Sequence, residues 1–222
     1  FSANSAIRLP TFTDLYYQSA TQISNPNLKP ETSKNLELGI KSNQKNLQWN
    51  ICTYYRAGKN IIDWIKHPDS TKWISSNLIH INAFGTDFHI DYQFIGSFLK
   101  SASFSYSYLY QDKNAEQFDS KYALDYLKHK ANLKLEHSFW KNLTGIWAIS
   151  YFDRAGNYTD FQTGKLVNYK PYLLADFQIN WAKSQYEIYS NLNNLLNVHY
   201  EDYGGIAQPG FTFNVGFRWK FL

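Results

Sequence analysis

The chain has 222 residues, a net charge of +4 and a hydrophobic content of 44%, which suits one large β domain or two small ones. Aromatic residues reach 18%, and aromatic rings pack well on the pleated surface of a strand. Lys and Arg are scattered along the chain, so the basic stripe that nucleic-acid binding requires is absent, and we expect no nucleic-acid partner.

In chain order, alternation of apolar and polar residues is the main pattern, and this alternation is typical of strands. We predict ten strands, with ends uncertain by a few residues. They lie at about 1–8, 31–41, 47–65, 78–95, 100–110, 127–137, 143–153, 170–182, 185–198 and 211–221.

The segment 211–221 shows the alternation most clearly. One set holds Phe211, Phe213, Val215, Phe217, Trp219 and Phe221. The other set holds Thr212, Asn214, Gly216, Arg218 and Lys220. A helix would mix the two sets, whereas a strand places them on opposite faces. Because one face carries charge, we expect it to meet water, while the apolar face meets lipid or a protein core.

The connections between the predicted strands alternate in length. Short ones are expected at 42–46, 96–99, 138–142 and 183–184, and long ones at 9–30, 66–77, 111–126, 154–169 and 199–210. Short periplasmic turns and long outer loops alternate in this way in outer-membrane barrels. The sequence therefore predicts an all-β fold, an antiparallel transmembrane β-barrel. A passive porin-like barrel and a soluble β-sandwich binding module stay open as alternatives.

Two features of the whole chain bear on the membrane assignment. No run of eighteen apolar residues exists, so no transmembrane helix is expected. The mean hydropathy of −0.48 is compatible with a barrel, because its strands alternate lipid-facing and lumen-facing residues.

Chemistry-bearing motifs are sparse. Cys52 is the single cysteine, so no internal disulfide can form. The six histidines are dispersed, without metal-ligand spacing. No nucleophile, base and orienting partner converge within a short motif. We therefore predict that the chain is no enzyme and that it holds no metal or cofactor.

Two separated stretches resemble a known family. The stretch Arg8-Leu9-Pro10, then Phe12 to Tyr17, Asn25-Pro26-Asn27-Leu28-Lys29-Pro30-Glu31 and Asn35-Leu36-Glu37-Leu38-Gly39 is similar to the barrel of TonB-dependent outer-membrane receptors. Near the end, Asn191 to Asn197, Tyr200 to Gly205 and Gln208-Pro209-Gly210 resemble cobalamin receptors and their siderophore-receptor relatives.

The resemblance implies a barrel of about 22 strands filled by an N-terminal plug, of which this chain would supply about ten C-terminal strands. The chain begins at Phe1 and contains no Met, so we expect residues 1–222 to be the C-terminal portion of the barrel, with the plug outside this portion. The implied function is energised uptake of a scarce nutrient, cobalamin or a ferric siderophore, across the outer membrane of a Gram-negative bacterium. The implied partners are outer-membrane lipid, the TonB complex acting through the plug, the small-molecule ligand and the barrel-assembly machinery.

Candidate ligand contacts are aromatic residues of the expected outer loops, because a flat and partly apolar ligand can stack on their rings. They are Tyr16, Tyr17, Trp73, Tyr158, Phe161, Tyr200 and Tyr203. Any one of them could instead belong to an interfacial girdle. The final residues resemble a barrel-assembly signal, carried by Asn214, Gly216, Trp219 and Phe221.

Overall fold

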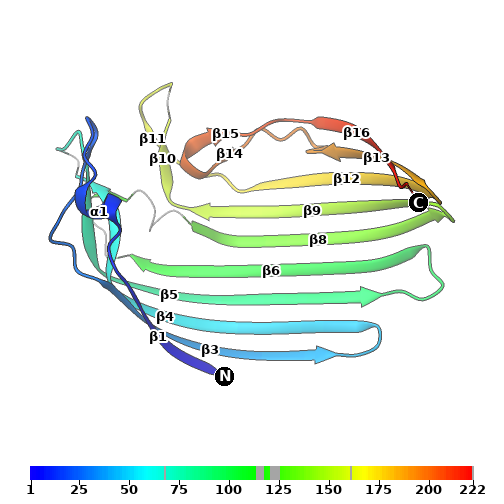
Figure 1. Ribbon diagram of the computed structural model, residues 1–222, viewed down its shortest axis with the longest axis horizontal. Coiled ribbons are helices and arrows are strands. Elements are labelled where there is room, and N and C mark those ends of the chain that lie inside the picture. The colour runs from blue at the N-terminus through cyan, green and yellow to red at the C-terminus, as the bar shows by residue number, and fades with distance from the viewer. Residues whose placement is uncertain (68, 114–117, 121–125, 161, 222) are drawn as a thin grey trace. The chain divides into compact units, whose positions relative to one another are not determined.

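The computed structural model describes residues 1–67, 69–113, 118–120, 126–160 and 162–221, and nearly all of its regular structure is strand (Figure 1). The long strands are β1 (Ser2–Arg8), β3 (Glu31–Asn43), β4 (Leu47–Lys66), β5 (Trp73–Gln93), β6 (Leu99–Lys113), β8 (Tyr126–Trp140), β9 (Leu143–Ala155), β12 (Tyr172–Lys183), β13 (Tyr186–Asn193) and β16 (Thr212–Trp219). The short elements are α1 (Phe12–Tyr16), β2 (Gln22–Ile23), β7 (Asp119–Ser120), β10 (Asn157–Thr159), β11 (Leu166–Asn168), β14 (Glu201–Asp202), η1 (Tyr203–Gly205) and β15 (Ile206–Ala207).

The long strands pair in chain order, β1-β3-β4-β5-β6-β8-β9-β12-β13-β16, with β2 added to β5 and β7 added to β4. The pairs β1–β3, β9–β12, β12–β13 and β13–β16 are antiparallel. All ten predicted strands are thus confirmed. The turns at 44–46, 94–98, 141–142 and 184–185 are short, as expected. Connections 9–30, 156–171 and 194–211 are long and contain the short elements.

Two boundaries were predicted wrongly. The connection expected at 66–77 is only 67–72, because β4 runs to Lys66 and β5 begins at Trp73, where β2 pairs with it. The strand expected to reach residue 198 ends at Asn193, because Asn194 and Asn197 have positive φ values of 50° and 48°. The connection 9–30 has the expected bounds, and it also contains helix α1, which was not predicted.

Contacts divide the chain into two compact units. Unit 1 comprises 1–39, 52–86 and 108–126, and unit 2 comprises 40–51, 87–107 and 127–222. The long strands β3 to β6 contribute to both units.

In unit 1 the long connection after β1 is folded onto the strands. Thr11 caps α1, its side chain accepting from the backbone N–H of Asp14 while its own N–H donates to the Asp14 carboxylate. Such a reciprocal capping box satisfies two backbone donors of a helix start. The Ser75 hydroxyl donates to the Asp14 carbonyl at 2.7 Å, and both residues are buried. A five-residue helix is too short to be stable alone, so these contacts hold it.

The segment Asn25 to Glu31, which resembled a family motif, is a structural turn in unit 1. The Asn25 side chain accepts from the Asn27 N–H at 2.9 Å, and Asn77 exchanges hydrogen bonds with the backbone of Lys29. Leu28 is buried. This segment therefore anchors the start of β3.

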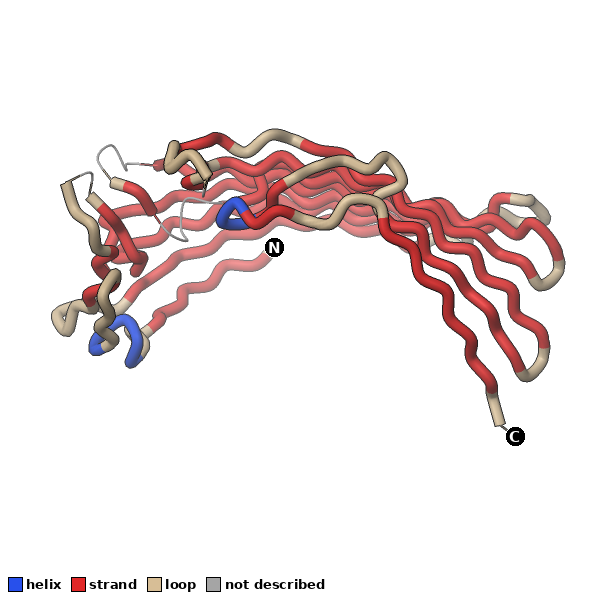
Figure 2. Tube along the Cα trace, turned by 90° about the horizontal axis from the view of Figure 1, so that it is seen from above, coloured by secondary structure: helices blue, strands red, loops and turns tan. Residues whose placement is uncertain are grey.

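Strands β12, β13 and β16 of unit 2 have one apolar face. The register places Trp181 opposite Ile188 and Ile188 opposite Phe217, with Phe213 and Val215 farther along β16. On β16 this face is open: Phe213 is 68% and Val215 66% exposed. Near the C-terminus these strands form a single layer (Figure 2).

The opposite face of the same strands is polar and hydrogen-bonded. Arg218 donates to Glu187 at 2.6 Å, and Asn191 donates to Asn214 at 2.9 Å. Gly216 lies opposite Tyr189, and a Cβ at residue 216 would overlap the tyrosine ring. The predicted separation of apolar and polar faces is therefore confirmed in β16.

The few buried hydrophobic residues among the described positions all belong to unit 1. They are Leu28, Ile62, Trp64, Ile65, Ile81 and Ala83. A soluble β-sandwich would bury the apolar faces of its sheets against each other. In the described part of the chain, the apolar face of β16 is not covered in this way. Within the described part of the chain, no helix is long and apolar enough to cross a membrane.

Val215→Arg tests which medium the apolar face meets. We expect it to lower the free energy of unfolding in lipid vesicles by up to about 2–4 kcal/mol, because a charge near the hydrocarbon midplane is poorly solvated. Gln178→Arg, on the polar face of β12, is the matched control and should have little effect. Denaturant titration of the full-length protein, followed by tryptophan fluorescence, measures both. Equal losses for the two variants would contradict a lipid-facing surface.

Candidate functional site: a tyrosine-lined pocket in the long connections

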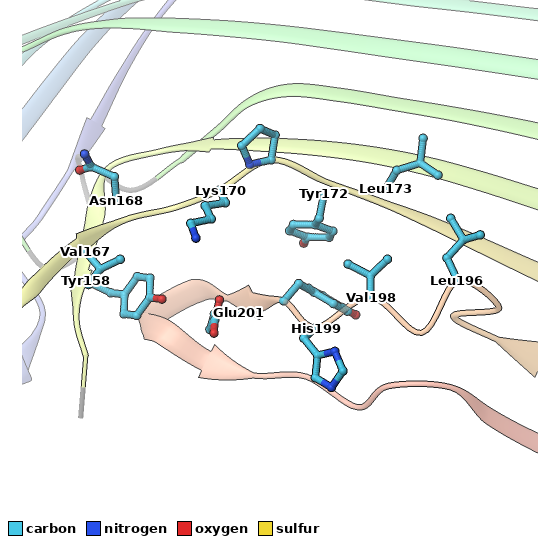
Figure 3. A pocket seen from close by; sticks show the side chains of 12 residues that line it. Tyr158, Val167, Asn168, Lys170, Tyr172, Leu173, Leu196, Val198, His199 and Glu201 are labelled. Atoms are coloured by element: carbon cyan, nitrogen blue, oxygen red, sulfur yellow. The ribbon is translucent and has the colours of Figure 1, made fainter. Parts of the chain in front are cut away.

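The long connections 156–171 and 194–211 of unit 2 enclose a cavity of about 510 Å³. Tyr158 comes from β10 and Tyr172 from the start of β12 (Figure 3). Tyr200 comes from the connection after β13. The remaining lining residues are Val167, Asn168, Lys170, Pro171, Leu173, Leu196, Val198, His199 and Glu201. This size lies within the range of small-molecule sites.

One wall of the pocket is a pair of stacked rings. Tyr172 and Tyr200 have ring centroids 4.3 Å apart at an interplanar angle of 29°. Phe152 of β9 continues the stack beyond Tyr172, at 5.1 Å. Aromatic pairs at such distances favour offset stacking, which fixes the rings in place. The wall therefore presents rigid, flat and partly apolar surface.

The Tyr200 ring is positioned by the turn that follows β13. Asn194 is buried, and its side chain donates to the carbonyls of Val198 and Pro209 and accepts from the N–H of Val198. The Asn194 N–H donates to the Asp176 carboxylate of β12 at 2.7 Å. This turn directs residues 198–200 back over β12.

The charged groups of the pocket differ in how they are engaged. The negative charge of Glu201 lies near enough to Tyr158 to raise the pKa of that phenol. Lys170 is exposed and forms no ion pair with any side chain that the structure describes. The pocket therefore combines aromatic surface with the carboxylate of Glu201 and the ammonium group of Lys170.

The pKa values of two pocket tyrosines are raised. Burial raises the pKa of Tyr158, and the negative charges of Glu201 and Asp160 add to that effect. Burial also raises the pKa of Tyr200, and the negative charges of Asp202 and Asp176 raise it further. Since the ordinary tyrosine pKa is about 10, both phenols are neutral at physiological pH and can donate hydrogen bonds.

The structure places the predicted ligand contacts in two groups. Tyr158 and Tyr200 line the same pocket. Tyr16 and Tyr17 are exposed at the end of α1 in unit 1. The backbone of Tyr203 lies in η1, whereas Phe161 lies outside the described residues.

Trp73 was predicted to lie in an outer loop, and this was wrong. It is the first residue of β5, and its N–H donates to the Thr21 carbonyl at 2.9 Å. The Lys66 ammonium lies 5.5 Å from the centre of its ring. Trp73 thus remains close to the connection between β4 and β5, but as part of the sheet.

Sequence reasoning missed Tyr172, Lys170 and His199 as lining residues. Tyr172 fell inside a predicted strand, and the other two carried no motif. The tyrosine pair at 158 and 169 and the acidic residues at 201 and 202 were the available signals, but they become neighbours only through folding. No group of three His, Cys, Asp or Glu side chains is placed to hold a metal ion in the described ranges.

The residues of the predicted assembly signal lie in and just after β16. Asn214 accepts from Asn191 on the polar face. On the apolar side the rings of Trp219 and Phe221 are stacked, 5.7 Å apart with an interplanar angle of 7°. Packing alone explains a glycine at position 216, because the Tyr189 ring occupies the space that a side chain would need. The role in assembly stays a prediction.

The raised tyrosine pKa values predict a pH limit for the pocket. A group whose pKa is higher in the folded state stabilises that state below its unfolded pKa of about 10, and the contribution is lost as the pH rises further. Tyrosinate absorbance at 295 nm, recorded for the wild type minus Tyr200→Phe, should show ionisation above that value. A difference titration whose midpoint lies near the ordinary tyrosine pKa would contradict the burial of Tyr200.

Comparisons with known proteins place the chain in a family. The profile of the family described as "TonB dependent receptor-like, beta-barrel" matches residues 1–195. The vitamin B12 transporter BtuB of Vibrio vulnificus is 40% identical over 77 residues, which are 35% of this chain and 12% of that protein. The BtuB of Photobacterium profundum is 29% identical over 123 residues, 54% of this chain and 18% of the relative. The chain thus matches less than a fifth of the length of these curated relatives.

Solved structures of low identity share the fold. The copper transporter OprC has a TM-score of 0.76 at 13% identity, covering 99% of this chain and 35% of that chain. The siderophore receptor PirA of Pseudomonas aeruginosa has a TM-score of 0.71 at 17% identity, covering 99% and 36%. The strands described above are therefore part of an antiparallel transmembrane β-barrel, and the chain belongs to the TonB-dependent receptor β-barrel family.

Proposed function

We propose that this chain is the C-terminal barrel portion of a receptor in the outer membrane of a Gram-negative bacterium, and that the receptor takes up cobalamin by TonB-dependent transport. The match to two vitamin B12 transporters carries the choice of cobalamin. A ferric siderophore is the second candidate, supported by the fold shared with a siderophore receptor.

In this proposal the long connections of the barrel capture the ligand at the cell surface. The pocket of Tyr158, Tyr172 and Tyr200 offers flat aromatic surface and neutral phenol donors, which suit a large, partly apolar ligand with polar edges. Tyr16, Tyr17 and Trp73 are further proposed contacts, from unit 1.

Transport requires parts beyond residues 1–222. We propose an N-terminal plug that fills the lumen and receives energy from the TonB complex, which displaces part of the plug and lets the ligand pass. The polar strand face, exemplified by Asn191, Asn214 and Arg218, would line that path. The C-terminal residues Gly216, Trp219 and Phe221 would be read by the barrel-assembly machinery, and lipid would cover the apolar face.

Ligand titration of the purified full-length receptor tests the choice of ligand. We expect cyanocobalamin to bind with a dissociation constant in the nanomolar range and ferric enterobactin not to compete. Isothermal calorimetry measures both. Tight binding of the iron complex without cyanocobalamin binding would replace cobalamin by a siderophore.

Alanine substitution of the pocket tyrosines tests the contact surface. Tyr158→Ala and Tyr200→Ala should each weaken cyanocobalamin binding by roughly 2- to 10-fold, because an aromatic contact contributes about 0.5–1.5 kcal/mol. Tyr186→Ala, at the opposite end of β13 from this connection, is the matched control and should leave affinity unchanged. Unchanged affinity in both pocket variants would remove the pocket from the ligand site.

Expression of residues 1–222 alone tests whether transport needs parts beyond this portion. Cells that carry only this portion should show no ligand-dependent uptake, because in this proposal the plug and the remaining strands lie outside it. Radiolabelled cyanocobalamin accumulation measures this, with the full-length receptor as the positive control. Energy-independent entry of small solutes in both strains would instead favour a passive porin-like barrel.

A further inference from the structure

The two long connections of unit 2 lie in close contact at Gly205. This glycine in η1 has a φ of +71°, and a Cβ at residue 205 would overlap the ring of Tyr158 in β10. Its neighbour Gly204 has a φ of +74°, but a Cβ there would meet no atom within 4 Å. The two glycines share the same backbone requirement, but only at residue 205 would an added Cβ meet another side chain.

A second contact between the connections is ionic. Arg154, at the end of β9, donates to the Asp202 carboxylate at 2.8 Å, and the two side chains are 13% and 46% exposed. The same guanidinium lies 5.6 Å from the centre of the Tyr169 ring. A partly desolvated guanidinium that is paired and stacked fixes its partners more firmly than an exposed ion pair does.

The third contact between the connections is a hydrogen bond. The Gly204 N–H donates to the Tyr169 hydroxyl at 2.8 Å, and Tyr158 and Tyr169 have ring centroids 5.1 Å apart. Arg154 precedes the connection 156–171, and Tyr158 and Tyr169 lie within it. Asp202, Gly204 and Gly205 lie in the connection 194–211. The pairs Gly205–Tyr158, Arg154–Asp202 and Gly204–Tyr169 each join residues more than thirty positions apart in the sequence.

We propose that the connections 156–171 and 194–211 are locked into one body, and that Gly205 and Arg154 are the positioning residues that keep Tyr158 and Tyr200 facing the same pocket. The lock holds β10 and η1 together, so loosening one connection loosens the other. Its relevance to ligand capture rests on the proposed function, whereas the lock itself does not.

Hydrogen exchange of the full-length receptor, without ligand, tests the lock. Gly205→Ala should raise exchange in peptides covering 157–168 by about fivefold or more, because the docked state opens more often. Gly204→Ala is the matched control, since it has the same backbone strain without the overlap and keeps the N–H that donates to the Tyr169 hydroxyl. It should raise exchange only around 203–207.

Two further variants separate a lock from a local defect. Arg154→Gln should raise exchange in 199–207, the connection to which it does not belong. Adding Tyr158→Ala to Gly205→Ala removes the overlap, and it should return exchange in 162–168 toward the wild-type rate. Equal exchange of 157–168 in Gly205→Ala and Gly204→Ala, or an effect of Arg154→Gln confined to its own strand, would overturn the proposal.

The outcome is independent of ligand identity. If wild-type receptor binds neither cyanocobalamin nor ferric enterobactin, the proposed function fails while the exchange result stands. If it binds cyanocobalamin, Gly205→Ala should weaken binding more than Gly204→Ala does.

Discussion

The constraint that governs this structure is the two-sidedness of its strands. A backbone that crosses hydrocarbon must satisfy every N–H and C=O by pairing, and a sheet does so while leaving its two faces free to differ. In unit 2, the face with Ile188, Phe213 and Phe217 has no second layer, and the face with Glu187, Asn191 and Arg218 is joined by hydrogen bonds. The exposed apolar side chains, which would be a liability in water, are the expected surface of a barrel in lipid.

This arrangement leaves little room for a conventional core. The buried apolar side chains are confined to unit 1, around Leu28, Ile62 and Ile81. There the strands extend beyond the predicted ends, and the connection with α1 packs against them through Asp14 and Ser75. The long connections are therefore folded structures with their own capping and hydrogen bonding, which ordinary surface loops of the same length lack.

The pocket in unit 2 follows from the same principle. Asn194 redirects the chain after β13, and Tyr200 then stacks on Tyr172 of a strand whose position is fixed by the sheet. The other wall comes from Tyr158, whose ring lies against Gly205 and packs on the Tyr169 ring. A rigid scaffold thus positions aromatic side chains on connections, which is where receptors can vary their ligand without changing the barrel.

The sequence by itself determined the ten long strands and, in β16, the side that is apolar, because a period of two is a local property that neighbouring residues express together. It also indicated the family, through two separated motifs, and it pointed to Tyr158 and Tyr200. Only the tertiary structure decided that these two tyrosines share a pocket with Tyr172 and Lys170, that Trp73 belongs to a strand, and that Gly205 lies against Tyr158. Those facts depend on contacts between residues far apart in the chain, and no periodicity records them.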